Sequence, residues 1–437
     1  MRRAFVRAIL ALFLVEAHPA FAEGPLHVDI TQGVASPLLL AIPDISSGAI
    51  PEVANGEDAG VALAKVVRAD LGSTGFYRLV TVDGHYAAAD EVAFTPFARA
   101  GAQALVVGRV RLVGNNVLAY DCALYDVFGA HLETSQRILV AAPQWRRAAH
   151  KCADMVFAFT TGDPGHFDTR LLVVGQDGER PGLHTRLLSM DYDGANQTVL
   201  SQGQELVAMP RYAPGSRKIV FLSFVMLVPQ LVLADLDSGQ ITALKIPPGV
   251  PSAPRFSPDG RSIIFSLARD GVADILVIDL QTGGVRQLTN TAGSNTSPGY
   301  SPDGAFVVFE SDRSGDPQLY VMASDGSGQK RISFGAGAHA SPMWSPRGDL
   351  IAFTLVENRR LRIGVMKADG SKERILTDGE RDEDPTWAPS GRALMFQRTA
   401  AGKALPGVWM TDLSGKLESR INIDPSASEP AWSGRRP

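Results

Sequence analysis

The sequence predicts two domains: a small N-terminal α/β domain followed by a six-bladed β-propeller. Three observations support this division. Residues 1–22 have the pattern of a cleavable export signal, residues 23–165 alternate strand-like and helix-like segments, and residues 166–437 repeat a short motif about every 44 residues. The 437 residues, 45% of them hydrophobic, are enough to form two or three buried cores.

The export signal combines a basic start with a short apolar run. Arg2, Arg3 and Arg7 precede the apolar residues 8–15, and Ala20-Phe21-Ala22 supplies a small-x-small cleavage site. The apolar run is too short to span a bilayer. We therefore expect export and a mature chain that begins at Glu23.

The repeat consists of a proline, a variable residue, an aromatic residue, Ser or Ala, and in most copies a second proline with a glycine one or two residues after it. Its leading prolines are separated by 44, 44, 44, 43 and 45 residues: Pro210, Pro254, Pro298, Pro342, Pro385 and Pro430. Two copies contain the tetrapeptide S-P-D-G, at 257–260 and 301–304. Ser, Pro and Gly at these positions suit a type I β-turn. The constant spacing indicates one structural unit, repeated.

Each unit has the pattern of four short antiparallel strands. A run of β-branched and aromatic residues follows the turn, as in 262–266, and a second strand ends at an Asp/Gly corner, as in 275–283. A short third strand follows, and we expect the fourth to be the aromatic-containing strand that enters the next turn. Four strands in 40–45 residues are typical of a propeller blade. We expect the six repeat aromatics to fill the space between blades: Tyr212, Phe256, Tyr300, Trp344, Trp387 and Trp432.

The two ends of the repeat region complement each other. The unit at 169–200 lacks its own proline–aromatic segment, whereas the segment at Pro430 has no unit after it. We expect the C-terminal segment to complete the first sheet, which closes a ring of six blades and leaves no open edge. Residues 219–236 are apolar enough to resemble a membrane span, but Pro229 interrupts them and they fall within the repeat, so we interpret them as a buried hairpin.

The region before the ring has no repeat. We predict strands at 26–30, 38–45, 77–82, 104–113 and 117–127, and helices at 57–71, 96–102 and 143–160. Alternating strands and helices indicate one α/β core. Cys122 lies in a strand-like run and Cys152 in a helix-like one. Export permits a disulfide, but the sequence leaves a bonded pair and two free buried thiols equally open.

Composition and motifs argue against several functions. A formal charge of −4 gives no reason to expect nucleic acid or an anionic membrane surface as a partner. The sequence contains no G-x-S-x-G, H-E-x-x-H, paired C-x-x-C or P-loop pattern, so we expect neither a catalytic site nor a cofactor. The acidic residues 380–384 could hold a cation near the channel, although we favour a plain solvated loop.

Taken together, the chain resembles the TolB family, periplasmic components of the Tol-Pal system of Gram-negative bacteria. The resemblance covers essentially the whole mature chain, and it is most specific in "ALVVGRV" (104–110), "AHKCADMVF" (149–157) and "TGDPGHFDTR" (161–170). It implies a periplasmic, monomeric adaptor without enzymatic activity that supports outer-membrane invagination and integrity during division. The implied partners are the lipoprotein Pal, the C-terminal domain of TolA and possibly other outer-membrane proteins, with membrane association through partners alone.

The resemblance also implies two sets of contact residues. The TolA-binding segment would be the mature N-terminus: Glu23, Leu26, His27, Val28, Asp29, Ile30 and Thr31. Pal would contact end loops just before the repeat prolines: Val250, Ala253, Thr296, Ser297, His339, Asp384 and Glu429. The chain departs from the family pattern at 247–253, "PPGVPSA", and at 224–230, "FVMLVPQ", which are unusually apolar.

Two other functions remain open from the sequence. A hydrolase or lyase could use the funnel of the propeller, and it would need converging His, Glu and Arg side chains at one mouth. A binding protein that senses glycan or peptidoglycan fragments would need only a shaped mouth.

Overall fold

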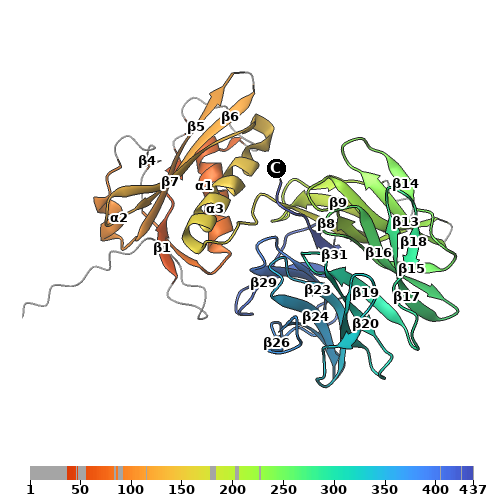
Figure 1. Ribbon diagram of the computed structural model, residues 1–437. Coiled ribbons are helices and arrows are strands. Elements are labelled where there is room, and N and C mark those ends of the chain that lie inside the picture. The colour runs from red at the N-terminus through yellow and green to blue at the C-terminus, as the bar shows by residue number, and fades with distance from the viewer. Residues whose placement is uncertain are drawn as a thin grey trace, which may run out of the picture.

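The computed structural model describes residues 37–45, 47, 56–82, 85–86, 92–114, 116–177, 184–201, 206–225, 228–403, 405–424 and 426–436. Figure 1 shows an N-terminal domain built from a sheet and helices beside a ring of sheets. The export signal and the predicted segment 23–31 lie outside the described residues. The two-domain fold class predicted from the sequence is confirmed.

The N-terminal domain contains a five-stranded mixed sheet in the order β3-β1-β5-β6-β7. β1 pairs in parallel with β3 and β5, whereas β5, β6 and β7 are antiparallel neighbours. The strands are β1 Leu38–Ala41, β3 Tyr77–Val80, β5 Ala104–Val113, β6 Val117–Asp126 and β7 His131–Ala141. β2 (Asp44–Ile45) and β4 (His85–Tyr86) form a separate short parallel pair. β7 was not predicted from the sequence, because its exposed polar residues outnumber its buried residues.

Two helices, α1 (Ala59–Gly72) and α3 (Trp145–Thr161), cover one face of this sheet, and the short α2 (Thr95–Arg99) packs on the other. A three-residue 3₁₀ turn, η2 (Ala142–Gln144), leads into α3. α1 begins after Asp58, whose side chain accepts hydrogen bonds from the backbone N–H of Gly60 at 2.9 Å and of Val61 at 3.1 Å. α3 ends at Gly162, whose φ of 72° is the left-handed conformation that suits glycine.

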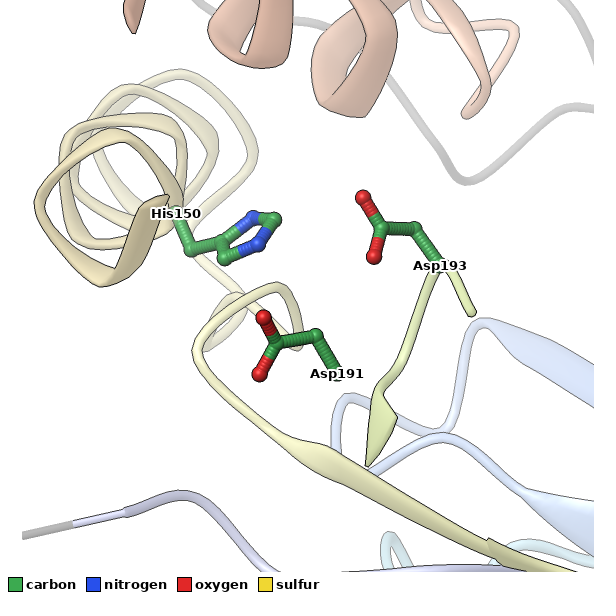
Figure 2. A group of neighbouring side chains, drawn as sticks. All are labelled: His150, Asp191 and Asp193. Atoms are coloured by element: carbon green, nitrogen blue, oxygen red, sulfur yellow. The ribbon is translucent and has the colours of Figure 1, made fainter. Parts of the chain in front are cut away.

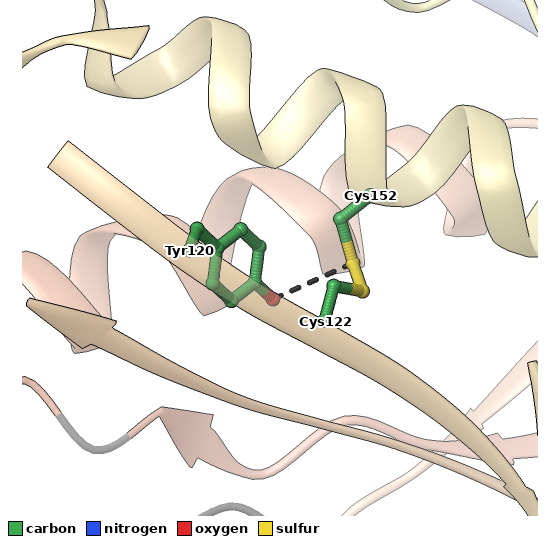
Figure 3. The surroundings of a disulfide bond; sticks show 3 residues. All are labelled: Tyr120, Cys122 and Cys152. Atoms are coloured by element: carbon green, nitrogen blue, oxygen red, sulfur yellow. Dashed lines mark hydrogen bonds between the residues drawn. A yellow bond between two sulfur atoms is a disulfide. The ribbon is translucent and has the colours of Figure 1, made fainter. Parts of the chain in front are cut away.

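Cys122 on β6 and Cys152 on α3 form a disulfide, which settles the alternative that the sequence left open (Figure 3). Both cysteines are buried. The hydroxyl of Tyr120 lies 3.4 Å from the sulfur of Cys152. The bond therefore ties the sheet to the helix that leads into the propeller.

The propeller consists of six four-stranded antiparallel sheets. In order from the first, the sheets contain β31 (Ser426–Trp432) with β8 (Arg170–Asp177), β9 (His184–Asp191) and β10 (Thr198–Val199); β11 (Leu206–Tyr212), β12 (Lys218–Val225), β13 (Val228–Asp235) and β14 (Ile241–Ala243); β15 (Val250–Phe256), β16 (Ser262–Arg269), β17 (Val272–Asp279) and β18 (Val285–Gln287); β19 (Asn295–Tyr300), β20 (Phe306–Ser311), β21 (Gln318–Ala323) and β22 (Lys330–Arg331); β23 (Ala338–Trp344), β24 (Leu350–Glu357), β25 (Arg360–Lys367) and β26 (Arg374–Ile375); β27 (Asp382–Trp387), β28 (Ala393–Arg398), β29 (Gly407–Asp412) and β30 (Glu418–Arg420).

The repeated turn is stabilised by its own serine and glycine. Gly260 has φ of 70°, and its backbone N–H donates to the carbonyl of Ser257 at 2.9 Å. The hydroxyl of Ser257 donates to Asp259 at 2.6 Å and accepts from the backbone N–H of Ser262 at 3.0 Å. The tetrapeptide thus closes the corner between β15 and β16.

One expectation about the blades is wrong. Each aromatic strand pairs with the strand after its own turn, as β15 pairs with β16, so it opens the following sheet rather than completing the preceding one. The tight turn joins the two strands directly and fixes them as hydrogen-bonded neighbours. The ring closes as expected: β31 pairs with β8, from Ser426 opposite Gln176 to Trp432 opposite Leu171.

The cores lie between neighbouring sheets. The repeat aromatics are buried or half-buried in these inter-blade clusters, as predicted. Trp432 joins a larger cluster that also includes α1 and α3, so the N-terminal core continues into the first blade. Residues 219–236 form the expected hairpin of β12 and β13. Within the described residues, no helix is both long and apolar enough to cross a membrane.

Candidate functional site

The central channel is lined by the first strand of each sheet. β11, β15, β19, β23, β27 and β31 each contact the next, and β31 contacts β11. Each strand runs from one mouth of the channel to the repeated turn at the other. Seven residues of strand span about 23 Å, so the two mouths are well separated surfaces.

A β-bulge interrupts every one of these strands at the residue before the repeat proline. At this position six non-glycine residues adopt φ between 48° and 54°: Met209, Ala253, Ser297, Ser341, Asp384 and Glu429. The register of each strand with its neighbour shifts there. Left-handed backbone costs most residues roughly 1–2 kcal/mol, so the bulge must be maintained by surrounding contacts.

Those contacts come from the preceding blade. The backbone N–H of Ser297 donates to the hydroxyl of Ser266 at 3.1 Å. The N–H of Ser341 donates to Glu310 at 3.3 Å. Three more bulge residues follow the same rule: the N–H of Met209 donates to Glu429, that of Glu429 donates to Gln397 at 3.0 Å, and that of Ala253 lies 3.1 Å from the sulfur of Met209. At the sixth bulge, the carboxylate of Asp384 accepts a hydrogen bond from the hydroxyl of Ser341 on the preceding blade at 3.0 Å. The bulges therefore stitch each blade to the one before it.

The channel carries opposite charges toward its two ends. Asp384 and Glu429 occupy bulge positions nearer the mouth at which the inner strands begin. Burial raises the pKa of Glu429, an effect that the N–H of Met209 and the Arg211 cation oppose. Arg211 and Arg255 follow their repeat prolines and lie in a cavity at the turn end. The channel is thus acidic toward one mouth and basic toward the other.

The residues predicted to bind Pal do lie at the strand-start end of the channel, but the prediction that they are loop residues is wrong. All seven belong to inner strands, because the bulge lets a strand continue through the position before proline. Val250 has an exposed fraction of 55%, and Ala253, Thr296, Ser297, Asp384 and Glu429 are partly exposed.

His339 is a second correction. Its side chain is fully buried, packs with ring centroids 5.0 Å from Phe353, and lies 3.1 Å from the carboxylate of Glu373. It points into the sheet stack rather than the mouth, because side chains alternate along a strand. It is therefore unable to contact a partner.

The acidic stretch 380–384 is not a solvated loop. Asp382 is fully buried at the start of β27 and accepts two hydrogen bonds from the guanidinium of Arg398, at 2.6 and 2.8 Å. Glu383 pairs with Arg381 at 3.1 Å. Arginine side chains thus satisfy these two carboxylates.

A second polar cluster joins the two domains. His150 on α3 faces Asp191 and Asp193 of the first blade (Figure 2). The Nδ1 atom of His150 lies 2.8 Å from the carboxylate of Asp70, which also accepts a hydrogen bond from the hydroxyl of Tyr192 at 2.7 Å. Burial alone lowers the pKa of His150, but the Asp70 carboxylate outweighs it and the pKa is raised.

His150 and the two carboxylates could in principle hold a metal, because their ligand atoms lie within 4.8 Å of one another. However, Asp193 already accepts from Arg146, and Asp191 accepts from Arg436 and Asn196, each at 2.6 Å. With cations and an amide on its carboxylates, the cluster is better explained as an ion-pair tie between α3 and the propeller.

The segment between the domains is tied down as well. Asp163 accepts hydrogen bonds from Arg347 and, at 2.6 Å, from Arg392, which belong to or follow repeated turns of two blades. Asp154 accepts from the backbone N–H of Phe167 at 2.8 Å and of Asp168 at 3.0 Å. Burial raises the pKa of Asp154 to about 6. The turn face of the propeller therefore meets the N-terminal domain, and the opposite mouth is directed away from these contacts.

His166 is buried in an aromatic cluster at this junction. Its ring centroid lies 4.5 Å from Phe167, 5.5 Å from Trp432 and 5.8 Å from Phe157. Its Nδ1 atom lies 3.1 Å from the hydroxyl of Ser390. Burial lowers the pKa of His166 to about 3, so the ring is neutral at neutral pH.

Comparison with known families agrees with this architecture. Residues 157–436 match the TolB beta propeller domain, and residues 26–132 match the TolB amino-terminal domain. The chain belongs to the TolB family.

Individual relatives agree with the family assignment. The Tol-Pal system protein TolB of Rhizorhabdus wittichii is 42% identical over 51% of this chain and 52% of its own length. That of Jannaschia sp. is 40% identical over 54% of this chain and 53% of its own. The chain thus matches these curated relatives over about half of their length. The crystal structure of TolB from Acinetobacter baumannii superposes with a TM-score of 0.80 at 24% identity, covering 94% of this chain and all of that one, which shows the shared fold.

Neither charged cluster was predicted from the sequence. Arg211 and Arg255 each precede a repeat aromatic residue directly, so their side chains are predicted to lie on the opposite side of the strand from that residue. The spacing of the repeat does not show that the two arginines share a cavity. His150, Asp191 and Asp193 come from separate domains and have no local spacing at all.

Proposed function

We propose that this chain is a non-enzymatic periplasmic adaptor of the Tol-Pal system. On this proposal the strand-start mouth of the propeller binds Pal, and residues 23–33 bind the C-terminal domain of TolA. The chain would thereby support outer-membrane invagination and integrity during division. We also propose that the boundary between the two domains lies between residues 165 and 166.

The observation that carries the Pal proposal is the position of the mouth. The turn face meets the N-terminal domain through Asp163 and His166, whereas Val250 and Thr296 lie at the other end of the channel. The bulges fix the strand ends around that mouth through hydrogen bonds from blade to blade, so it presents a preorganised surface, which lowers the entropic cost of binding a partner.

The hydrolase or lyase alternative receives little support. It needs converging His, Glu and Arg side chains, yet the cavity at the turn end is lined by arginines with neither a histidine nor a carboxylate. At the other end, Asp384 accepts a hydrogen bond from Ser341 at 3.0 Å and Glu429 accepts one from Met209. These carboxylates act as acceptors in the bulge network.

Capture by Pal tests the first half of the proposal. Immobilised Pal from the same organism should retain the full chain. Thr296→Arg should weaken capture at least tenfold, because a large cation at the mouth obstructs close packing. The control is Ser216→Arg, since Ser216 is exposed at the opposite end. Equal capture of the two variants would remove the mouth from the proposal.

Deletion of residues 23–33 tests the second half. We expect the shortened chain to keep its circular dichroism spectrum and melting temperature, because few contacts usually cross a segment at the very end of a domain. Binding to the C-terminal domain of TolA should be lost, whereas capture by Pal should persist. Unchanged affinity for TolA would refute the assigned role of the segment.

A further inference from the structure

The cavity at the turn end of the channel has a volume of about 380 Å³. Its walls are the repeat aromatics and the second prolines of the turns, among them Trp344, Trp387 and Trp432. Arg211 and Arg255 are the charged residues among its lining. An apolar chamber with two cations and no lining carboxylate is suited to an anion that carries an apolar group.

Arg255 is poorly satisfied within the described part of the chain. Its Nε atom is buried and has no hydrogen-bond partner there. Its Nη1 atom lies 3.8 Å from the thioether sulfur of Met343, a weak acceptor. Its stem packs near Gly299, where no side chain intervenes. The guanidinium thus extends across the channel from β15 toward the fourth and fifth blades.

The two arginines differ in their surroundings. Arg211 donates to the carbonyl of Pro210 at 2.7 Å and is attracted by both Asp384 and Glu429. Arg255 is attracted by Asp384 but repelled by Arg211, and burial together with that repulsion lowers its pKa. Burial lowers the pKa of both arginines, but two carboxylates oppose this effect at Arg211 and one does so at Arg255. Arg255 is therefore the less compensated cation, which favours a ligand with a single negative charge.

We propose that this cavity binds a monocarboxylate attached to an apolar or aromatic group, with the carboxylate on Arg255 and the apolar part against the repeat aromatics. A planar guanidinium can hold a carboxylate through two parallel hydrogen bonds. The source can be a small organic acid or the free carboxyl end of a peptide, since both present the same chemistry. The site is separate from the proposed Pal mouth and does not depend on that proposal.

Calorimetric titration of the full chain tests the site with defined probes. N-acetyl-phenylalanine should bind, and its carboxamide analogue should bind at least tenfold more weakly because it lacks the charge. Inorganic phosphate should bind more weakly than N-acetyl-phenylalanine. The peptide Gly-Gly-Phe and its C-terminal amide separate the two sources: preference for the free peptide points to a chain end, and preference for the small acid points to a metabolite.

Two arginine variants give the matched comparison. Arg255→Gln should weaken the binding of N-acetyl-phenylalanine at least tenfold. Arg269→Gln, which replaces an exposed arginine on the adjoining strand, should leave this affinity unchanged. Arg255→Gln should melt at the same or a higher temperature than the parent, because it removes a poorly partnered buried charge. Arg255→Lys keeps the charge but loses the fork, so it should fall between the parent and Arg255→Gln.

Several results would overturn the proposal. Absence of N-acetyl-phenylalanine binding would refute the proposed site. Equal binding of the acid and the amide would show that the cavity recognises only the apolar group and not the carboxylate. Tighter binding of phosphate would contradict the monoanion argument. Unchanged affinity in a folded Arg255→Gln variant would show that Arg255 does not hold the ligand.

Discussion

Acidification should weaken the junction between the domains through His166. The folded-state pKa of His166 is lowered to about 3, compared with about 6.5 in an unfolded chain. The unfolded state therefore binds the proton first as the pH falls, and the stability contributed by the neutral ring is fully present above pH 6.5 and is lost below it. The loss is about 1.4 kcal/mol per pH unit in this range, or about 2 kcal/mol at pH 5.

A neighbouring group acts in the opposite direction. The pKa of Asp154 is raised to about 6 by burial, so the folded state takes up a proton there before the unfolded state does, and acidification from pH 6.5 to 5 stabilises the fold. The dependence of the parent protein's unfolding free energy on pH is consequently a sum of opposing effects. Only the difference between the parent and a variant at His166 isolates the histidine.

The test is urea unfolding of the parent and of His166→Phe between pH 6.5 and 5. Phenylalanine preserves the aromatic packing against Phe157 and Trp432 but has no proton to gain. The free-energy difference between the parent and the variant should shift by about 2 kcal/mol across this range, in favour of the variant at pH 5. His184→Asn, at an exposed histidine, should follow the parent. Parallel curves for the parent and His166→Phe would refute the assignment.

Three further changes probe stability. Replacing Cys122 and Cys152 together by alanine should lower the free energy of unfolding of the N-terminal domain by about 3–4 kcal/mol, because the bond spans 30 residues; a denaturation midpoint equal to that of the oxidised parent would contradict this. Asp163→Asn should weaken the junction by about 1–3 kcal/mol, seen as faster proteolysis between the domains; an unchanged cleavage rate would argue against the tie. Ala253→Gly should raise the stability by up to about 1 kcal/mol by relieving a φ of 48°, whereas Ala208→Gly on β11 should lower it; a melting temperature that falls in both would show that the bulge is unstrained.

The repeat made most of the propeller predictable. The S-P-D-G turns, the alternating runs and the unmatched segments at 169–200 and Pro430 were enough to give the number of blades and their closure. The phase of the blades was mistaken, because spacing alone leaves open whether an aromatic strand ends one sheet or begins the next. The pairing of β15 with β16 decides it through the tight turn between them.

The candidate site was less predictable, for two physical reasons. The residue before a proline ordinarily signals the end of a strand or a loop, whereas here the left-handed bulge lets the strand continue, which the sequence does not indicate. Burial of individual side chains, such as His339 and Asp382, depends on which side of a strand they occupy after the bulge shifts the register. A sequence gives alternation but not the shift.

The pairing of β31 with β8 joins residues near opposite ends of the ring, so the first blade exists only when the last strand has arrived. A product truncated before residue 426 would leave β8 with a bare edge and Trp432 missing from the core that connects to α3. An incomplete chain therefore exposes an unpaired strand edge that is prone to aggregation and proteolysis, whereas a complete chain does not.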